Sequence, residues 1–308
     1  MWTAWPLHVG LRDACGNRVD AVHYHGDGRW PELASGGGSS LELRDPRADN
    51  GVAEAWAASD EAKASAWQTV TYQGVAAPSA VGPDGFYQEL VLGLLDAGTV
   101  LLDDVSVIED PAGAATQLIQ NGSFESGTAA SWRLLGNHRH SAVVVDPTDA
   151  GNHVLRVVAT GATEHMHNHL ETTLKAGHSI TNGKTYQISY RAKWEGGSNQ
   201  LNSRLYFDRL AKTTLLPLPA LHGTPGAANS RAEANVGPTY HDLHHTPAVP
   251  QPSQPVLVSV SADDPDGIDK LTLWVSVDGN AATSLPMVSE GKGHFSAQVP
   301  GFAGGACH

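Results

Sequence analysis

The amino-acid sequence predicts an all-β protein built from several β-sandwich modules. Its 33 glycines and 18 prolines supply many turns, and short runs rich in valine and threonine lie between those turns. This pattern favours strands over helices. At 308 residues the chain is long enough for two or three domains, because single domains usually hold about 100–200 residues.

Charge and hydropathy exclude two classes of partner. The chain carries 32 acidic and 19 basic side chains, a formal net charge of −13, and such a surface repels nucleic acid and anionic lipid. The sequence contains no run of 18 apolar residues, so we expect no membrane insertion. Cys15 and Cys307 lie near opposite ends and predict neither a disulfide framework nor a cysteine-based zinc site.

Residues 118–125 (Leu-Ile-Gln-Asn-Gly-Ser-Phe-Glu) form a strand-like run that breaks at Asn-Gly, and Ser131-Trp132 marks the next strand. These residues resemble the opening of family 4/9-type carbohydrate-binding modules, which belong to the galactose-binding-like group. The resemblance implies a jelly-roll sandwich over residues 117–220.

The N-terminal segment resembles part of another module of secreted bacterial proteins. Residues 1–44 contain two alternating runs around a Cys-Gly-Asn turn, then a Trp-Pro step and a Gly-Gly-Gly-Ser-Ser stretch. They resemble the C-terminal part of a lamin-tail-like β-sandwich. Because a hairpin alone buries too little surface to be stable, we expect its missing strands upstream. The stretch from Gly223 to Ser230 resembles the linker of such proteins, including those with spore-coat-protein-H-like domains.

The other boundaries follow from changes in composition. Residues 45–112 predict a short or partial jelly-roll module, since Leu101–Val107 resembles the closing strand of the same group. Residues 221–255 read as a linker rich in proline and histidine. Residues 256–304 resemble the start of an immunoglobulin-like or cadherin-like module. Partial immunoglobulin-like sandwiches are therefore expected on both sides of a central jelly roll.

Three segments of the central module predict one polar sheet surface. In residues 185–194 and 201–207, apolar and polar side chains alternate, as they do on a strand with one buried face. Residues 164–174 follow the same rule if they form a strand, which their β-rich surroundings favour. If the three strands share a sheet, their polar sides form a single surface. That surface comprises His165, His167, His169, Glu171, Arg191, Asn202, Arg204 and Tyr206.

Such a surface suits a polysaccharide or glycan. Planar donors and acceptors match pairs of sugar hydroxyls, and Trp132 or Trp194 would supply an aromatic ring for the face of a pyranose. A surface that is polar only because water covers it is the alternative, since antiparallel sheets often leave one face solvated.

The histidines at positions 165, 167 and 169 also suggest a transition-metal site. On a strand, alternate histidines lie about 7 Å apart, and on a helix His165 and His169 would lie one turn apart; both spacings suit zinc or copper. No His-Glu-x-x-His motif accompanies them, so no catalytic residue is named. The alternative function is a metal-dependent hydrolytic or oxidative enzyme centred on these histidines.

The resemblance to carbohydrate-binding modules further implies a structural calcium near the first Phe-Glu strand and the closing aspartates. Glu125 matches the first position, and Asp208 is the nearest carboxylate within the central module. Calcium takes six to eight oxygen ligands, so these two residues alone would not complete a site.

The sequence lacks a nucleophile elbow, a phosphate-binding loop, a dinucleotide fingerprint and the kinase motifs. It therefore predicts a non-catalytic carbohydrate-binding or adhesion protein of several modules, with a structural spacer as a further alternative. An extracellular or cell-surface location is implied by the resemblance alone, because residues 1–6 lack the features of a signal peptide.

Overall fold

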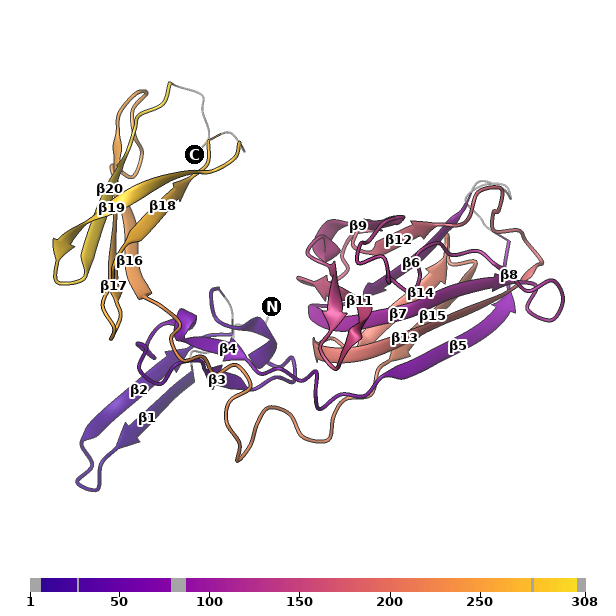
Figure 1. Cartoon of the computed structure of the whole chain (residues 1–308), viewed down its shortest axis with the longest axis horizontal. Helices are drawn as coiled ribbons and strands as arrows, with labels where there is room; N and C mark the ends of the chain where they lie inside the picture. The colour runs from indigo at the N-terminus through magenta and orange to yellow at the C-terminus, as the bar shows by residue number, and fades with distance from the viewer. Residues whose placement is uncertain (1–6, 27, 79–86, 278–279, 304–308) are drawn as a thin grey trace. The chain divides into compact units, whose positions relative to one another are not determined.

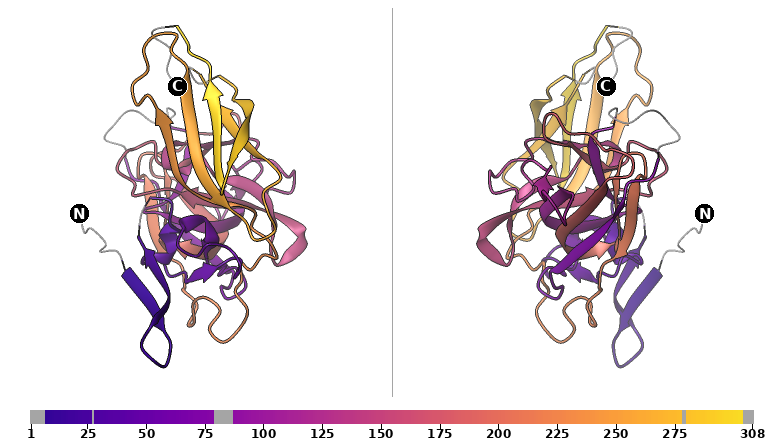
Figure 2. Two further views of the ribbon diagram at one scale, coloured as in Figure 1. Left: turned by 90° about the vertical axis from the view of Figure 1, so that its left-hand side faces the viewer. Right: turned by 90° about the vertical axis from the view of Figure 1, so that its right-hand side faces the viewer.

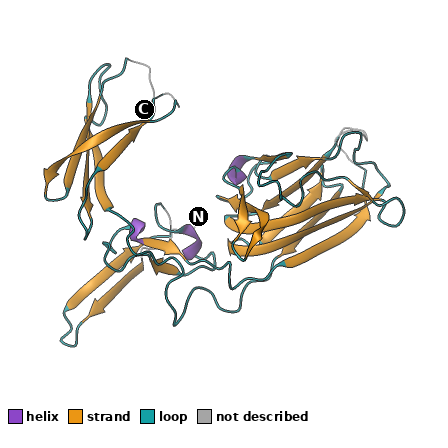
Figure 3. Ribbon diagram, in the orientation of Figure 1, coloured by secondary structure: helices purple, strands orange, loops and turns teal. Residues whose placement is uncertain are grey.

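The computed structural model describes residues 7–26, 28–78, 87–277 and 280–303, which are nearly all strand and loop (Figure 3). Helical structure within these residues is limited to short 3-10 turns. These are η1 (Glu32–Ala34), η2 (Ala53–Ala55) and η3 (Gly136–His138). The predicted all-β class is confirmed.

The chain divides into two compact units, and each unit combines segments that are far apart in sequence. The first unit comprises residues 1–31, 41–57 and 231–308, and the second comprises residues 32–40 and 58–230. The second unit is therefore inserted into the first along the chain.

The second unit is a sandwich of two antiparallel sheets. One sheet has the strand order β10-β11-β7-β13-β5, with β8 beside β7, and the other has the order β15-β14-β6-β12-β9. The strands are β5 (Gln68–Val75), β6 (Glu89–Leu94), β7 (Gly98–Glu109), β8 (Thr116–Gln117), β9 (Trp132–Leu134), β10 (Ala142–Asp146), β11 (Asp149–Ala159), β12 (Leu170–Thr173), β13 (Thr185–Gly197), β14 (Gln200–Leu205) and β15 (Leu210–Leu215).

Alternating apolar side chains build the core between these two sheets. On β13 the even-numbered residues from Tyr186 to Ala192 are buried, as the sequence predicts. Leu90, Leu92 and Leu94 of β6 are fully buried and pack into the same core from the other sheet. Because successive side chains of a strand point to opposite faces, the residues between these leucines lie on the outer face of their sheet.

The predicted boundary between residues 112 and 117 does not divide two sandwiches. Strands β5, β6 and β7 come from the region 45–112, yet each pairs with strands that follow residue 117 (Figure 1). β7 lies between β11 and β13, and β6 lies between β12 and β14. The physical reason is that the apolar inner faces of these strands require a second sheet, and the later strands provide it.

The first unit contains the expected N-terminal hairpin. Its strands β1 (Leu7–Arg12) and β2 (Arg18–Tyr24) pair in antiparallel fashion. Gly16 in the connecting turn has a φ of +85°, a conformation that favours glycine. Two further short strands, β3 (Leu41–Leu43) and β4 (Trp56–Ala58), pair with each other.

The first unit also contains a five-stranded sheet with the order β16-β17-β20-β19-β18. Its strands are β16 (Thr239–Thr246), β17 (Val256–Asp263), β18 (Leu271–Val275), β19 (Thr283–Gly291) and β20 (His294–Val299). β17 and β20 lie side by side in all views (Figures 1 and 2). Residues 239–246 were expected in a linker; they instead form β16, because their backbone pairs with β17.

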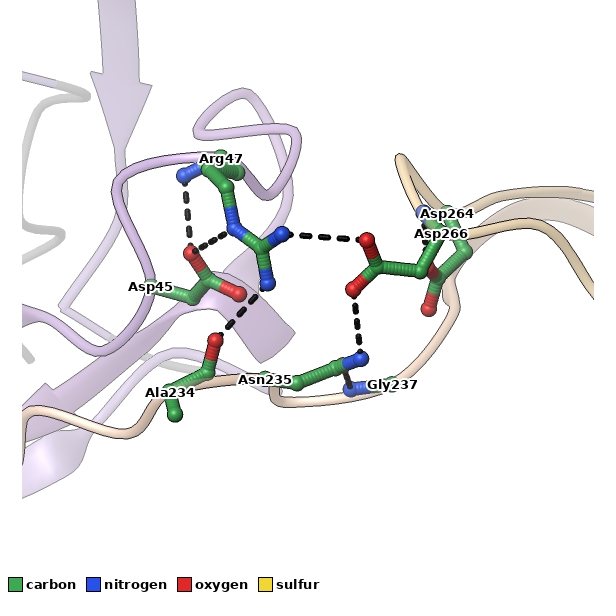
Figure 4. A network of polar contacts seen from close by, with 7 residues as sticks. All are labelled: Asp45, Arg47, Ala234, Asn235, Gly237, Asp264 and Asp266. Atoms are coloured by element: carbon green, nitrogen blue, oxygen red, sulfur yellow. Dashed lines mark hydrogen bonds and ion pairs between the residues drawn. The ribbon is translucent and has the colours of Figure 1, made fainter.

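An arginine connects three segments of the first unit (Figure 4). Arg47 donates a hydrogen bond to Asp266 Oδ1 at 3.0 Å and another to the carbonyl oxygen of Ala234 at 2.8 Å. Its backbone N–H donates to Asp45 Oδ1 at 2.8 Å, and Asn235 Nδ2 donates to Asp266 Oδ2 at 2.9 Å. A guanidinium therefore neutralises the aspartate turn that follows β17.

Candidate functional site

The outer face of the sheet β15-β14-β6-β12-β9 carries most of the polar residues that the sequence analysis singled out. Leu170 of β12 and Leu201 and Leu205 of β14 point into the core. The residues between them therefore point outward. These outward residues include Glu171, Thr173, Asn202 and Arg204, and Tyr206 follows directly after β14.

Strand register places five of the outward residues in one row across the sheet. Val91 of β6 is opposite both Glu171 of β12 and Arg204 of β14. Arg133 of β9 is opposite Glu171, and Ala211 of β15 is opposite Arg204. Val91 is only 1% exposed although it lies on the outer face, so other side chains of this face cover it. The row is a packed polar surface rather than a set of separate solvated side chains.

Glu171 is held from two sides. Arg133 Nε donates to its Oε1 at 2.5 Å, and His169 Nε2 lies 3.2 Å from its Oε2. Burial acts to raise the pKa of Glu171, but the hydrogen bonds from Arg133 and His169 outweigh this effect and lower the pKa. Burial lowers the pKa of His169, and Glu171 offsets only part of that shift. The carboxylate is therefore fixed in its ionised form and in one orientation.

Arg204 is held less tightly than Arg133. Its Nη1 donates to Asn202 Oδ1 at 3.2 Å, and its Nε lies 3.4 Å from Asp208 Oδ1. The Asp208 side chain is 69% exposed, so water screens this ion pair. Asn202 in turn donates to Thr213 Oγ1 at 3.0 Å.

A small notch opens on this face beside Gly93. It has a volume of about 10 Å³, and it is lined by residues 91–95 together with Thr163, Asn168, His169, Asn202 and Arg204. A side chain at position 93 would crowd the neighbouring histidines, since an added Cβ would lie 3.1 Å from His138 Nε2 and 3.5 Å from His169 Cα. Glycine at this position therefore leaves room for the His138 ring to pack against β6.

His138 packs against β6 next to this notch. It is fully buried, its Nε2 accepts a hydrogen bond from the backbone N–H of Leu94 at 3.0 Å, and its Nδ1 lies 2.6 Å from Asn137 Oδ1. An acceptor role for Nε2 leaves the proton on Nδ1, which donates to Asn137. Burial lowers the pKa of His138 to about 4, so the ring is neutral at pH 7.

Aromatic rings lie at the Tyr206 end of the face. The rings of Tyr206 and Tyr87 have centroids 5.1 Å apart, and Phe207 lies 4.5 Å from Tyr206. Tyr206 is half-buried, and burial raises its pKa. The aromatic surface on this face therefore comes from tyrosine and phenylalanine.

The histidine segment is a turn where a strand was expected. Strand β12 begins only at Leu170, and the N–H of Asn168 donates to the carbonyl of His165 at 3.0 Å. Asn168 Oδ1 accepts from the N–H of Asn137 at 3.2 Å. These local bonds replace strand pairing in the segment. His165 and His167 are exposed, whereas His169 is buried next to Glu171.

Three predicted ligand residues lie elsewhere in the sandwich. Arg191 is on β13 in the other sheet, where its Nη1 lies 3.3 Å from Asp103 Oδ2 and its guanidinium covers the ring of Trp67. Trp132 and Trp194 are 7% and 1% exposed and belong to the core. Alternation within one segment does not reveal which strands share a sheet, and this explains the error for Arg191. Trp194 continues the buried even-numbered positions of residues 185–194, so the alternation itself places it in the core.

The predicted metal ligands have separate partners. Glu125 Oε1 accepts from the backbone N–H of His153 at 3.2 Å, and Asp208 pairs with Arg204. In the described part of the chain, no group of three or more His, Cys, Asp or Glu side chains is placed to hold a metal ion. Glu125 and Asp208 therefore take part in separate contacts, and of the three histidines His169 has a carboxylate beside it, that of Glu171 at 3.2 Å.

Sequence reasoning missed Arg133, Asn168, Gly93 and His138. The alternation Trp132-Arg133-Leu134 carries a signal for Arg133, because a core tryptophan and a core-facing leucine place the arginine outward. Gly93 has no such signal, since its role depends on His138 and His169, which are distant in sequence.

A larger hollow belongs to the first unit. This groove of about 830 Å³ is lined by residues of β16, β17 and β18 and by the segments 248–254 and 299–303, with Trp274 and Phe302 among them. It offers few hydrogen-bonding side chains, so the face around Val91 is the better candidate for a polar ligand.

Comparison with known proteins yields one match. Residues 116–211 match a family model described as a carbohydrate binding domain. Neither the curated proteins nor the solved structures contain a match. No helix in the described residues is long and apolar enough to cross a membrane. The matched region contains β9, β12 and β14, so it supplies Arg133, Glu171 and Arg204, and it identifies this part of the chain as similar to a carbohydrate-binding domain.

Proposed function

We propose that the protein is a non-catalytic carbohydrate-binding protein that holds a glycan on the outer face of the sheet β15-β14-β6-β12-β9. The observation that carries the proposal is the row Arg133–Glu171–Val91–Arg204, which lies within and beside the region that matches a carbohydrate-binding domain. Fixed charged groups of both signs on one surface suit pairs of sugar hydroxyls, which donate and accept hydrogen bonds.

The Tyr206 end of the face supports the same proposal. The partly exposed Tyr206 ring, with Tyr87 and Phe207 beside it, offers an apolar surface for one face of a pyranose. This role replaces the one first assigned to Trp132 and Trp194. An extracellular or cell-surface location and an adhesion role belong to the same proposal and rest on the resemblance to secreted bacterial modules.

Arg204→Ala is expected to weaken glycan binding about 10- to 100-fold, because the variant loses a charge-assisted donor at the centre of the face. The measurement is a dissociation constant for a glycan selected from an array with the wild-type chain. Arg156→Ala is the matched control, since Arg156 is ion-paired with Glu195 in the other sheet. Equal losses in both variants, or no loss in Arg204→Ala, would contradict the proposed face.

The calcium and the zinc or copper predictions are tested separately, by metal analysis of untagged protein. Stoichiometric zinc or copper that disappears in His167→Ala would favour the metal-enzyme alternative. The lamin-tail and spore-coat-protein-H-like resemblances stay predictions.

A further inference from the structure

The notch beside Gly93 has spare hydrogen-bond donors. Within the described residues, Arg204 Nη2 and Asn168 Nδ2 donate to no partner. Both groups belong to residues that line the notch. The other atoms of these two side chains are engaged: Arg204 Nη1 donates to Asn202, and Asn168 Oδ1 accepts from Asn137.

Among the described residues, two side-chain acceptors of the notch lack a donor: Thr163 Oγ1 keeps its lone pairs, and His169 Nδ1 is buried without a partner. Asn202 Oδ1 accepts from Arg204 at 3.2 Å, and Thr163 Oγ1 donates to the carbonyl of Leu94 at 2.9 Å. Both oxygens of Glu171 face donors, Arg133 at 2.5 Å and His169 at 3.2 Å. Because one of the two spare donors belongs to a positively charged guanidinium, an anionic acceptor group fits this notch best. A sugar hydroxyl donates as well as accepts, whereas a carboxylate only accepts.

We infer that the notch takes the carboxylate of a uronic acid residue, so that the ligand of this face is a glycan containing uronate. The inference rests on the proposed glycan-binding function and specifies its ligand. Arg204 Nη2 would donate to one carboxylate oxygen and Asn168 Nδ2 to the other, and a lysine at position 204 would not reproduce the planar donor. The notch is too small for a pyranose ring, and ligand pockets usually hold about 300–1,000 Å³. The ring would lie on the face while the carboxylate enters the notch.

The two arginines of the face differ in how strongly a carboxylate neutralises them. Arg133 is neutralised by Glu171, whose side chain is 17% exposed, at 2.5 Å. Arg204 faces Asp208 at 3.4 Å, and that carboxylate is 69% exposed and screened by water. Arg204 therefore retains the more available positive charge.

The net charge of the chain limits the kind of uronate glycan. A protein with a net charge of −13 repels a densely charged polyanion over a long range. A neutral glycan with isolated uronate branches avoids this repulsion and still presents one carboxylate to Arg204. Glucuronate-substituted neutral glycans are therefore the expected class, ahead of continuous polyuronates.

The test uses the full chain and matched ligand pairs. Glucuronoxylan oligosaccharides and other neutral glycans with isolated uronate branches are compared with the same glycans after chemical reduction of the carboxyl group to an alcohol. We expect reduction to weaken binding to the wild-type protein at least 10-fold. Arg204→Ala is expected to bind both forms with equal, low affinity, and Arg204→Lys is expected to recover only part of the preference.

Each outcome bears on one claim. If native and reduced glycans bind equally and Arg204→Ala weakens both, the uronate inference is wrong and the glycan-binding face stands. If neither form binds the wild-type protein, the proposed function fails together with the inference. The comparison of native with reduced ligand requires no variant, so it decides the inference even if a substitution prevents folding. Arg156→Ala serves as the control and is expected to keep the wild-type preference.

Discussion

Replacing Trp194 with alanine is expected to reduce the free energy of unfolding of the second unit by about 3–5 kcal/mol, the usual cost of removing a large aromatic side chain from a core. Trp194 is 1% exposed, its Nε1 donates to the carbonyl of Gly197 at 3.1 Å, and its ring meets His222 edge-on at 5.6 Å. The substitution leaves a cavity and an unsatisfied carbonyl. Urea unfolding, followed through hydrogen exchange of β13 in the full chain, measures the change.

Leu215→Ala is the control for Trp194→Ala. Leu215 lies in the same sandwich but is 66% exposed, so its removal is expected to change the free energy of unfolding by no more than about 0.5 kcal/mol. A Trp194→Ala protein that keeps its stability and loses only glycan binding would contradict the core assignment and restore the stacking role that the sequence suggested. Trp194→Phe, which keeps an aromatic ring in the core, is expected to lie between the two.

Acidification from pH 7 to pH 4 is expected to lower the free energy of unfolding of the second unit by about 3 kcal/mol through the titration of His138. Burial lowers the pKa of His138 from 6.5 to about 4, and each pKa unit corresponds to about 1.4 kcal/mol. Between these two values the unfolded chain binds a proton that the folded chain excludes, so stability falls as the pH falls through this window. The loss levels off below the folded pKa of about 4.

The measurement compares the pH dependence of unfolding in the wild type and in His138→Gln. Glutamine offers an oxygen to the N–H of Leu94 and an amide donor to Asn137, but it does not titrate. We expect the variant to be less stable at pH 7 and to lose about 3 kcal/mol less than the wild type on acidification. Parallel pH profiles would show that His138 is protonated as easily in the folded chain as in the unfolded chain.

The residues that sequence reasoning placed correctly are those whose position follows from local alternation. The even-numbered residues of 185–194 are buried, and Asn202 and Arg204 point outward, as a two-residue period requires. Glu171 joins them because β12 and β14 both flank β6. The hairpin around Gly16 could also be predicted from the sequence, because its turn depends on neighbouring residues only.

The errors arose where long-range pairing decides the structure. Arg191 has the expected outward position on its strand, but β13 lies in the opposite sheet. The order of the motifs also led to the wrong prediction of two modules. Leu101–Val107 resembles a closing strand, and it precedes the segment 118–125, which resembles an opening strand. In the folded chain the first of these segments pairs with β13 and β11, so both motifs belong to one sandwich. No local pattern encodes that pairing.

The central claim, a glycan on the outer face of the five-stranded sheet, is tested most directly by methyl NMR during glycan titration. Val91 and Val154 form a matched pair, because they lie on the outer faces of the two opposite sheets and are 1% and 0% exposed. We predict that the methyl signals of Val91 shift with increasing glycan while those of Val154 stay in place. Shifts at Val154 with an unchanged Val91 would place the ligand on the other sheet and refute the account.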